Sequence, residues 1–254
     1  MQKVLEVFRP EQYEPADWQE VDIATAIYYL PARPYSAQWS EMRCRKTTTG
    51  LWLLDRVLDY HERDAANCLI VTTKSGKGTY YDAVPKSLPD GYRLFDVDKD
   101  GAWEIIDGLS FPLEGDEFLF ELLVPTTRNI VLSHYHCWTN RSLMKSHLKV
   151  LKGLDWDFGM IDEAHRIKNK DTQWTKNLKD LTIAYKHVMT GTGFVNNPAE
   201  LWSILNFLDP KRWRSYWGFA RHFCRYALVS GFEKIIGLRE DNKAEFIELR
   251  KWLG

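Results

Sequence analysis

The stretch WDFGMIDEAHRIKN, residues 156–169, joins a short apolar run to two adjacent carboxylates. The segment 158–162 is apolar and bounded by polar residues, which predicts a buried strand that ends at Asp162. Neighbouring carboxylates at a strand end repel each other unless a cation or a proton-transfer role compensates them. In an enzyme with a phosphate-binding loop, Asp162 would hold Mg²⁺ and Glu163 would polarise an attacking water. The alternative is a solvated acidic turn.

Four other short apolar runs have the same character and predict further buried strands. They are SAQW at 36–39, CLIVTT at 68–73, NIVLS at 129–133 and KHVMTGT at 186–192. Helical patterns separate several of these runs. Strands that alternate with helices predict an α/β fold, in which a parallel sheet carries helices on both faces. Ligands of such sheets bind where strands end and helices begin.

Two of the helical patterns are well marked. In residues 47–63 an apolar face is formed by Leu51, Leu54, Val57 and Leu58. In residues 196–208, Asn197 is a candidate N-cap, and Glu200 stands three residues later, as in a capping box.

Composition and charge are those of an ordinary globular protein: 254 residues, 44% hydrophobic, 27% charged and a net charge of −1. Any nucleic-acid contact must therefore come from a local patch. The sequence has neither an apolar run long enough for a membrane span nor a secretory signal, so we expect an intracellular chain. The four cysteines, Cys44, Cys68, Cys137 and Cys224, form no C-x-x-C pair. This argues against a disulfide framework and a zinc knuckle, and predicts buried thiols.

A second strand end, in residues 188–210, runs through Thr190-Gly191-Thr192 into the helix at 196–208. Together with 156–169, this segment resembles the Swi/Snf-type DNA translocases, helicase-like ATPases of superfamily two. Their pattern is an Asp-Glu-Ala-His box, then Thr-Gly-Thr-Pro, then a Leu-Trp-x-x-Leu-Asn-Phe-Leu helix. Gly193 stands where the family usually has proline, and Val195 where it often has glutamine. The resemblance extends through PADWQ at 15–19, LIVTTKSGKGTYYD at 69–82, VLSHYHCW at 131–138 and the segment after 223.

The resemblance implies a RecA-like P-loop fold that binds ATP and Mg²⁺. EMRCRKT at 41–47 then aligns with the family's EMGLGKT, so that Arg43 and Arg45 replace two glycines of the phosphate loop. A non-glycine residue in a left-handed conformation costs about 1–2 kcal/mol, which weakens phosphate binding without abolishing it. The residues implied around the phosphates are Arg43, Cys44, Arg45, Lys46, Thr47 and Thr48.

The same resemblance assigns roles to the remaining site residues. Gln19 would contact adenine, Lys46 would reach the β- and γ-phosphates, Thr47 and Asp162 would hold the metal, and Glu163 would activate water. His165, Thr190, Gly191 and Thr192 would couple nucleotide state to DNA contacts. Those contacts would be made by Lys74, Ser75, Lys77, Ser133 and His134. Because they hold backbone phosphates, binding would be salt-dependent and tolerant of sequence.

Three local patterns have competing interpretations. DVDKDGAWEIID at 96–107 matches a calcium loop, but Pro89 and Gly91 interrupt the entering helix that such a loop needs, which favours an exposed acidic turn between strands. The basic and aromatic segment 209–226 is either a nucleic-acid surface or a helical hairpin that buries Trp213, Trp217 and Phe223. His134 and His136 have i, i+2 spacing, but we expect no third ligand near them, which argues against a metal site there.

We expect residues 1–254 to form one RecA-like lobe without the second lobe. Only 62 residues follow Thr192, and the family's second lobe supplies the arginines that complete the site. A fragment or half of a split enzyme, with negligible turnover alone, is therefore expected, in the cytoplasm of a prokaryotic cell or virus-infected host. The alternatives are a non-catalytic DNA-binding or regulatory module with a decayed phosphate loop, and an RNA helicase. The RNA helicase is disfavoured because such enzymes usually carry Ser-Ala-Thr at 190–192.

Overall fold

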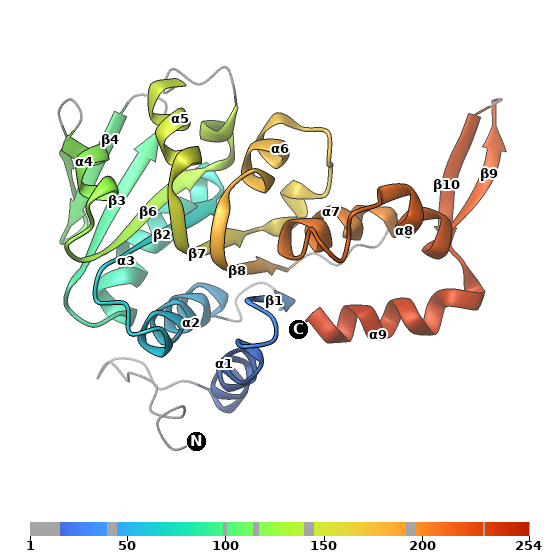
Figure 1. The fold of residues 1–254 in the computed structure, drawn as a ribbon, viewed down its shortest axis with the longest axis horizontal. Coiled ribbons are helices and arrows are strands. Elements are labelled where there is room, and N and C mark those ends of the chain that lie inside the picture. Colours follow the sequence, from blue (N-terminus) through green and yellow to red (C-terminus); the bar gives the residue numbers. More distant parts are fainter. Residues whose placement is uncertain are drawn as a thin grey trace.

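The computed structural model describes residues 16–39, 45–98, 101–113, 117–139, 145–191, 197–230 and 232–253. Within them, one large sheet has the strand order β1-β8-β7-β2-β6-β3-β4-β5 (Figure 1). The pairs from β1 to β3 are parallel, and β4 and β5 extend the sheet in antiparallel fashion. The strands are β1 Tyr35–Trp39, β2 Ala66–Thr72, β3 Tyr92–Asp98, β4 Gly101–Ile106, β5 Leu109–Pro112, β6 Arg128–His134, β7 Asp155–Asp162 and β8 Thr182–Thr190.

All five predicted apolar runs lie in strands of this sheet, although Thr192 falls outside the described residues. Successive residues of a strand face opposite sides. Cys68 and Ile70 therefore belong to one apolar cluster, and Leu69 and Val71 to another. Every residue of β2 is buried. The sheet is thus covered on both faces, which confirms the α/β prediction.

Helices from different parts of the chain cover the two faces (Figure 1). The cluster that contains Cys68 includes side chains of α1 Asp17–Tyr29, α2 Lys46–Tyr60 and α3 Lys77–Ser87. The opposite cluster includes side chains of α4 Glu117–Leu123, α5 Lys145–Gly153, α6 Gln173–Lys179 and α7 Ala199–Leu208. Short 3-10 turns follow several strands: η2 Lys74–Gly76, η3 Tyr135–Trp138, η4 Ala164–Ile167 and, later, η5 Glu240–Asn242.

The two predicted helices are present as α2 and α7. The Asn197 side chain accepts a hydrogen bond from the Ala199 amide at 3.0 Å, as an N-cap residue does. The carboxylate of Glu200 lies 3.2 Å from Nζ of Lys168, the residue that follows η4. Glu200 therefore forms an ion pair with Lys168 instead of closing a capping box.

The C-terminal segment departs from the prediction of a helical hairpin at 209–226. Helix α8 Tyr216–Phe223 leads directly into the strand pair β9 Cys224–Val229 and β10 Phe232–Leu238, which projects from the body before α9 Lys243–Leu253 returns toward β1 (Figure 1). Phe223 is buried as predicted, whereas Trp217 is 61% exposed. The hairpin prediction is wrong because the helical apolar pattern stops at Phe223.

The calcium-loop pattern at 96–107 is not a helix–loop–helix. Asp98 and Gly101 are paired residues of the β3–β4 hairpin, and 101–106 is a strand. This places Asp107 at the far end of β4, away from Asp96 and Asp98. The turn lies between strands as predicted, but Asp96 is buried rather than exposed, because it pairs with Lys77.

Cys68, Cys137 and Cys224 are buried free thiols, as predicted, while Cys44 lies outside the described residues. Among the described helices, none combines the length and the apolar character that a membrane crossing requires.

An ionic cluster ties α2 to the first residues of β3 and β6. Arg128 lies 3.1 Å from the buried Asp55 carboxylate and 2.8 Å from Asp59. It also donates to the Arg63 carbonyl at 2.8 Å and to the Tyr92 hydroxyl at 3.2 Å. Burial raises the pKa of Asp55, while the Tyr92 hydrogen bond and Arg128 oppose that shift. Arg128 therefore compensates a charge that α2 carries into the interior.

We predict that Arg128→Met lowers the free energy of unfolding by about 3 kcal/mol, because it leaves the buried Asp55 carboxylate with the Tyr92 hydroxyl but without the Arg128 charge. The pKa of Asp55 would rise further, so the loss is largest near pH 8 and shrinks as the pH falls toward that pKa and the carboxyl protonates. Urea unfolding at several pH values measures this. The control is Arg63→Met, because Arg63 is 58% exposed beside Asp157 and should contribute under about 1 kcal/mol. Equal losses in the two variants would contradict the prediction.

Candidate functional site

The Asp162 carboxylate at the end of β7 is fixed by two hydrogen bonds. Thr72, the last residue of β2, donates to Oδ2 at 2.8 Å, and the Glu163 amide donates to Oδ1 at 2.9 Å. Burial raises the pKa of Asp162, and these hydrogen bonds act against that shift. A half-enclosed carboxylate held in one orientation is a suitable ligand for a hard cation.

Glu163 follows in a strained backbone conformation, with φ 54° and ψ 51°. This is the left-handed region, which non-glycine residues rarely occupy. The Tyr135 hydroxyl contacts the backbone carbonyls of both Asp162 and Glu163, the latter at 3.2 Å. Tyr135 begins η3, immediately after β6, so the end of a strand that lies beyond β2 supports the turn at Glu163.

His165 connects the acidic pair to the end of β8. Its Nδ1 lies 3.2 Å from Glu163 Oε2 and 3.3 Å from Thr190 Oγ1. Burial lowers the pKa of His165, with the Glu163 carboxylate acting in the opposite direction. The structure therefore brings together Glu163, His165 and Thr190. Gly191 follows at the end of the described segment, and Thr192 lies outside it.

The start of α2 contains the described part of the predicted phosphate loop. Arg45 is the N-cap residue, with φ 48° and ψ 31°, and Lys46, Thr47 and Thr48 begin the helix. The left-handed backbone expected at Arg45 is confirmed. The N-terminus of a helix presents free amides and a positive dipole end, which suit a phosphate. Arg43 and Cys44 lie outside the described residues.

Tyr80 of α3 stands between the two halves of the site, and sequence reasoning missed it. Its side chain is fully buried. Burial, followed by the Asp162 carboxylate, raises the pKa of Tyr80 well above its usual value, while the Thr47 hydroxyl acts in the opposite direction. The phenol is thus within electrostatic reach of both groups, although its oxygen has no well-aligned hydrogen bond within the described residues. Thr47 and Asp162, predicted to share a metal, both act on the Tyr80 phenol.

Gln19 is fully buried at the contact between α1 and α2. Its Nε2 donates to Thr49 Oγ1 at 2.7 Å, and its Oε1 accepts from the Ala16 amide at 2.9 Å. The side chain therefore joins α1 to the first turns of the helix that begins at Lys46. Its contact with adenine stays a prediction.

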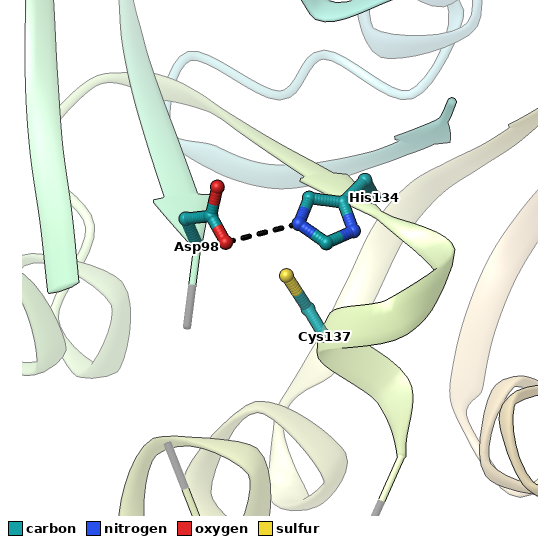
Figure 2. Close-up of side chains that lie close together, drawn as sticks. All are labelled: Asp98, His134 and Cys137. Atoms are coloured by element: carbon teal, nitrogen blue, oxygen red, sulfur yellow. Dashed lines mark hydrogen bonds and ion pairs between the residues drawn. The ribbon is translucent and has the colours of Figure 1, made fainter. Parts of the chain in front are cut away.

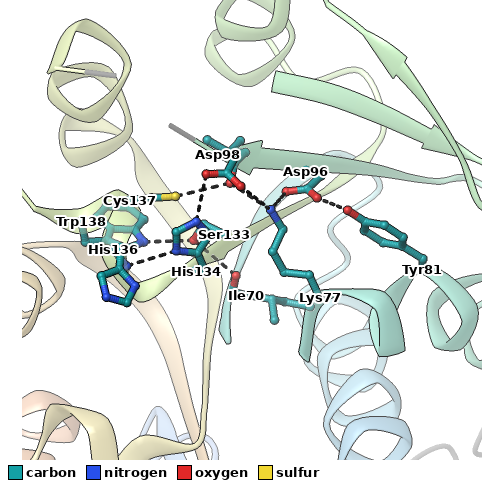
Figure 3. A network of polar contacts seen from close by, with 11 residues as sticks. Ile70, Lys77, Tyr81, Asp96, Asp98, Ser133, His134, His136, Cys137 and Trp138 are labelled. Carbon is teal, nitrogen blue, oxygen red and sulfur yellow. Dashed lines mark hydrogen bonds and ion pairs between the residues drawn. The ribbon is translucent and has the colours of Figure 1, made fainter. Parts of the chain in front are cut away.

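The five residues predicted to hold nucleic acid fall into two groups. Lys74 and Ser75 in η2 are exposed, whereas Lys77, Ser133 and His134 are buried in a polar network (Figure 3). Lys77 pairs with Asp96, and His134 Nε2 lies 3.0 Å from Asp98 Oδ1. Ser133 Oγ accepts from Trp138 Nε1 at 3.0 Å. The phosphate contacts stay predictions, and the geometry favours Lys74 and Ser75.

Comparison with solved structures shows the fold. The SWI2/SNF2 ATPase core of Sulfolobus solfataricus in complex with dsDNA matches with a TM-score of 0.62 and 20% identity, over 86% of this chain and 41% of that chain. The same core domain described without dsDNA gives a TM-score of 0.60, 21% identity and coverage of 88% and 41%. The RecA-like architecture is therefore confirmed.

Curated relatives match over shorter parts of their own length. A chromodomain-helicase-DNA-binding protein 3 homolog of Caenorhabditis elegans is 33% identical over 43% of this chain and 6% of its own length. An ISWI chromatin-remodeling complex ATPase, CHR17 of Arabidopsis thaliana, is 28% identical over 75% of this chain and 16% of its own. The chain thus spans less than a fifth of either relative. These relatives do not support the predicted prokaryotic or viral cytoplasm.

The model of the SNF2-related domain matches residues 64–253, which include both strand-end motifs described above. The match covers well over half of the sequence. The chain therefore belongs to the SNF2-related domain family.

Proposed function

We propose that this chain is the ATP-binding lobe of a DNA translocase, which binds ATP with Mg²⁺ and holds duplex DNA by its backbone. The observation that carries the proposal is the Asp162 carboxylate held at the end of β7 by Thr72, with Glu163 directly after it. Asp162 and Thr47 also both act on the buried Tyr80 phenol. A carboxylate and a hydroxyl placed beside a helix N-terminus are the groups that a metal–nucleotide complex uses. Family membership supports the same assignment.

The groups present fit a magnesium ion. Burial penalises the charge of Asp162, and a cation at its free lone pairs would compensate that charge. Asp162 and Thr47 would hold the ion, which when bound would neutralise the charge of the phosphates. Lys46 would orient the terminal phosphates, and Glu163 would accept the proton of the attacking water.

His165 is placed to respond to events at Glu163. Because burial lowers the pKa of His165, the neutral ring can donate one hydrogen bond, either to Glu163 or to Thr190. A proton taken up by Glu163 would weaken its attraction for His165 and favour the contact with Thr190. This supports a coupling role for His165, Thr190 and the adjoining Gly191.

The DNA surface is proposed at η2. Lys74 and Ser75 are exposed directly after β2, whose last residue Thr72 holds Asp162. Contacts there would lie one short turn from the nucleotide site. The Sulfolobus relative was solved with dsDNA, which supports a duplex as the partner. A second RecA-like lobe, in cis or in trans, would supply the transition-state arginines.

A second candidate function is a non-catalytic regulatory module. Arg45 favours it, because a long side chain stands at the left-handed position where a phosphate cradle normally has glycine. The two functions differ in whether the chain binds ATP at all.

We predict that Glu163→Gln leaves ATP affinity nearly unchanged and suppresses hydrolysis, because only the water-activating carboxylate is lost. Affinity is measured with a fluorescent ATP analogue, and hydrolysis in single turnover with the chain in excess and duplex DNA present. The control is Glu62→Gln, since Glu62 also has a left-handed backbone, φ 52°, but lies in the exposed turn after α2. Hydrolysis by Glu163→Gln at the rate of the unmodified chain would refute the role of Glu163.

We also predict that Arg45→Gly tightens ATP binding by about tenfold, because it removes about 1–2 kcal/mol of left-handed strain. Lys46→Ala should weaken binding by about 10- to 100-fold through the loss of a charged hydrogen bond. Ser230→Gly is the matched control, since it removes left-handed strain, φ 54°, in the distant β9–β10 turn. Titration calorimetry gives all four affinities.

Unchanged affinity in both loop variants would favour the regulatory module. A severe loss in Arg45→Gly would show instead that the arginine itself binds phosphate.

A further inference from the structure

Three metal-binding side chains converge at the carboxyl ends of β3 and β6, outside the proposed nucleotide site. They are Asp98, the last residue of β3, His134, the last residue of β6, and Cys137 in η3 (Figure 2). One ligand atom from each lies within 4.8 Å of the others. Parallel pairing of β3 with β6, in the register Val97↔Ser133, places Asp98 beside His134. Cys137 directly follows His136 in the sequence, and the pairing of β3 with β6 adds Asp98, which lies 36 positions before His134.

The chemical nature of the three ligand atoms indicates which metal ion they would bind. Carboxylate oxygen, imidazole nitrogen and thiolate sulfur are all ligands of Zn²⁺, whereas Mg²⁺ and Ca²⁺ require oxygen. Three protein ligands leave one position of a tetrahedral ion for water. We propose that Asp98, His134 and Cys137 form a Zn²⁺ site.

The charges around the three side chains favour a cation. Two carboxylates, Asp96 and Asp98, face one ammonium group, that of Lys77 (Figure 3). Lys77 Nζ makes its close contact with Asp96 and lies 3.8 Å from Asp98 Oδ2. Asp98 and Asp96 carry two negative charges and Lys77 one positive charge. Zn²⁺, together with the thiolate that it requires, brings the net charge of the cluster to zero.

His134 is already oriented toward the cluster. Its Nδ1 accepts a hydrogen bond from the His136 amide at 3.2 Å, which leaves Nε2 directed at Asp98. In the neutral ring Nε2 therefore carries the proton. When Nε2 binds zinc, this proton moves to Nδ1, so Nδ1 stops accepting from the His136 amide and a zinc–nitrogen bond forms at Nε2.

The Cys137 thiol would lose its proton when it binds the metal. Its Sγ contacts the Val97 carbonyl at 3.5 Å, and the thiol must ionise to bind the metal. The S–H bond breaks, a zinc–sulfur bond forms, and one proton is released to solvent. No oxidant or reductant is needed. The bound ion would strengthen the link between the end of β3 and η3, which the contact of Cys137 Sγ with the Val97 carbonyl already makes.

The first test uses Co²⁺ as a spectroscopic probe on the full chain. Cobalt bound by Cys137 should give sulfur-to-metal charge-transfer absorption in the near ultraviolet at one ion per chain, and added Zn²⁺ should abolish it. Cys137→Ser should lower Zn²⁺ affinity at least about 100-fold, beyond the usual effect of losing an outer-shell partner. His134→Gln should also weaken binding strongly.

Matched controls separate this site from general damage. Cys224→Ser removes another buried thiol, and His187→Gln another buried imidazole, and both should keep the affinity of the unmodified chain. Zinc should also raise the thermal midpoint of the unmodified chain but not that of Cys137→Ser.

Absence of the charge-transfer band in the folded, unmodified chain would overturn the proposal, and so would full Zn²⁺ affinity in Cys137→Ser. Equal loss in Cys224→Ser would assign the thiolate elsewhere and overturn it too. If Cys137→Ser does not fold, the spectrum of the unmodified chain and the affinity of Asp98→Asn decide the question. None of these measurements involves ATP, so the proposal stands or fails independently of the proposed function.

Discussion

The parallel pairing of β2 with both β6 and β7 is the constraint on which the rest of this structure depends. The register sets Val71 opposite Ile161 on one side and Thr72 opposite His134 on the other. All three strands therefore end at the same edge of the sheet. Because β2 is buried along its whole length, this register cannot slip by one residue without exchanging the two apolar faces. Packing of the apolar core therefore fixes the positions of the polar groups at this edge of the sheet.

Two polar centres result from this one edge. On the β7 side, Thr72 holds Asp162, and Tyr135 supports the turn at Glu163. On the β3 side, Asp98 meets His134. Residues 134 and 135 are adjacent in sequence but serve opposite sides of β6. The two centres are therefore linked through η3. A movement of η3 would shift contacts in both centres.

Much of the fold could be predicted from the sequence because its strands are fully buried and read as apolar runs. The strands of the extension β3–β4–β5 are mixed in polarity and do not form apolar runs, so the acidic pattern at 96–107 indicates a turn between strands but not their place in the sheet. The same difficulty explains Lys77. A lysine in a basic segment reads as solvent-exposed, and only the sheet reveals that Asp96, nineteen positions later, lies beside it in the interior.

Some residues of the candidate site could be predicted from the sequence, and others could not. Asp162, Glu163 and His165 are close in sequence, so their grouping followed from the pattern itself. Tyr80 and Tyr135 could not be found, because each acts through contacts with residues about thirty to eighty positions away, and an isolated tyrosine carries no periodic signal. The left-handed Arg45 could be predicted, because the requirement comes from the backbone of the loop and not from its partners.

Arg45 and Glu163 show how a fold can maintain strained backbone where chemistry is expected. Each non-glycine residue in the left-handed region costs about 1–3 kcal/mol, which is a large part of the stability of a domain. At Glu163 the strained backbone is held by hydrogen bonds on both sides, from Tyr135 to its carbonyl and from its own amide to Asp162. At Arg45 the free-energy cost of the strain corresponds to about a tenfold loss of affinity. A phosphate bound by several amides and a lysine gains more than that, and the arginine adds positive charge of its own. Replacement of glycine by arginine is therefore compatible with a loop that still binds anions, and the strain at Arg45 alone does not indicate that the site has decayed.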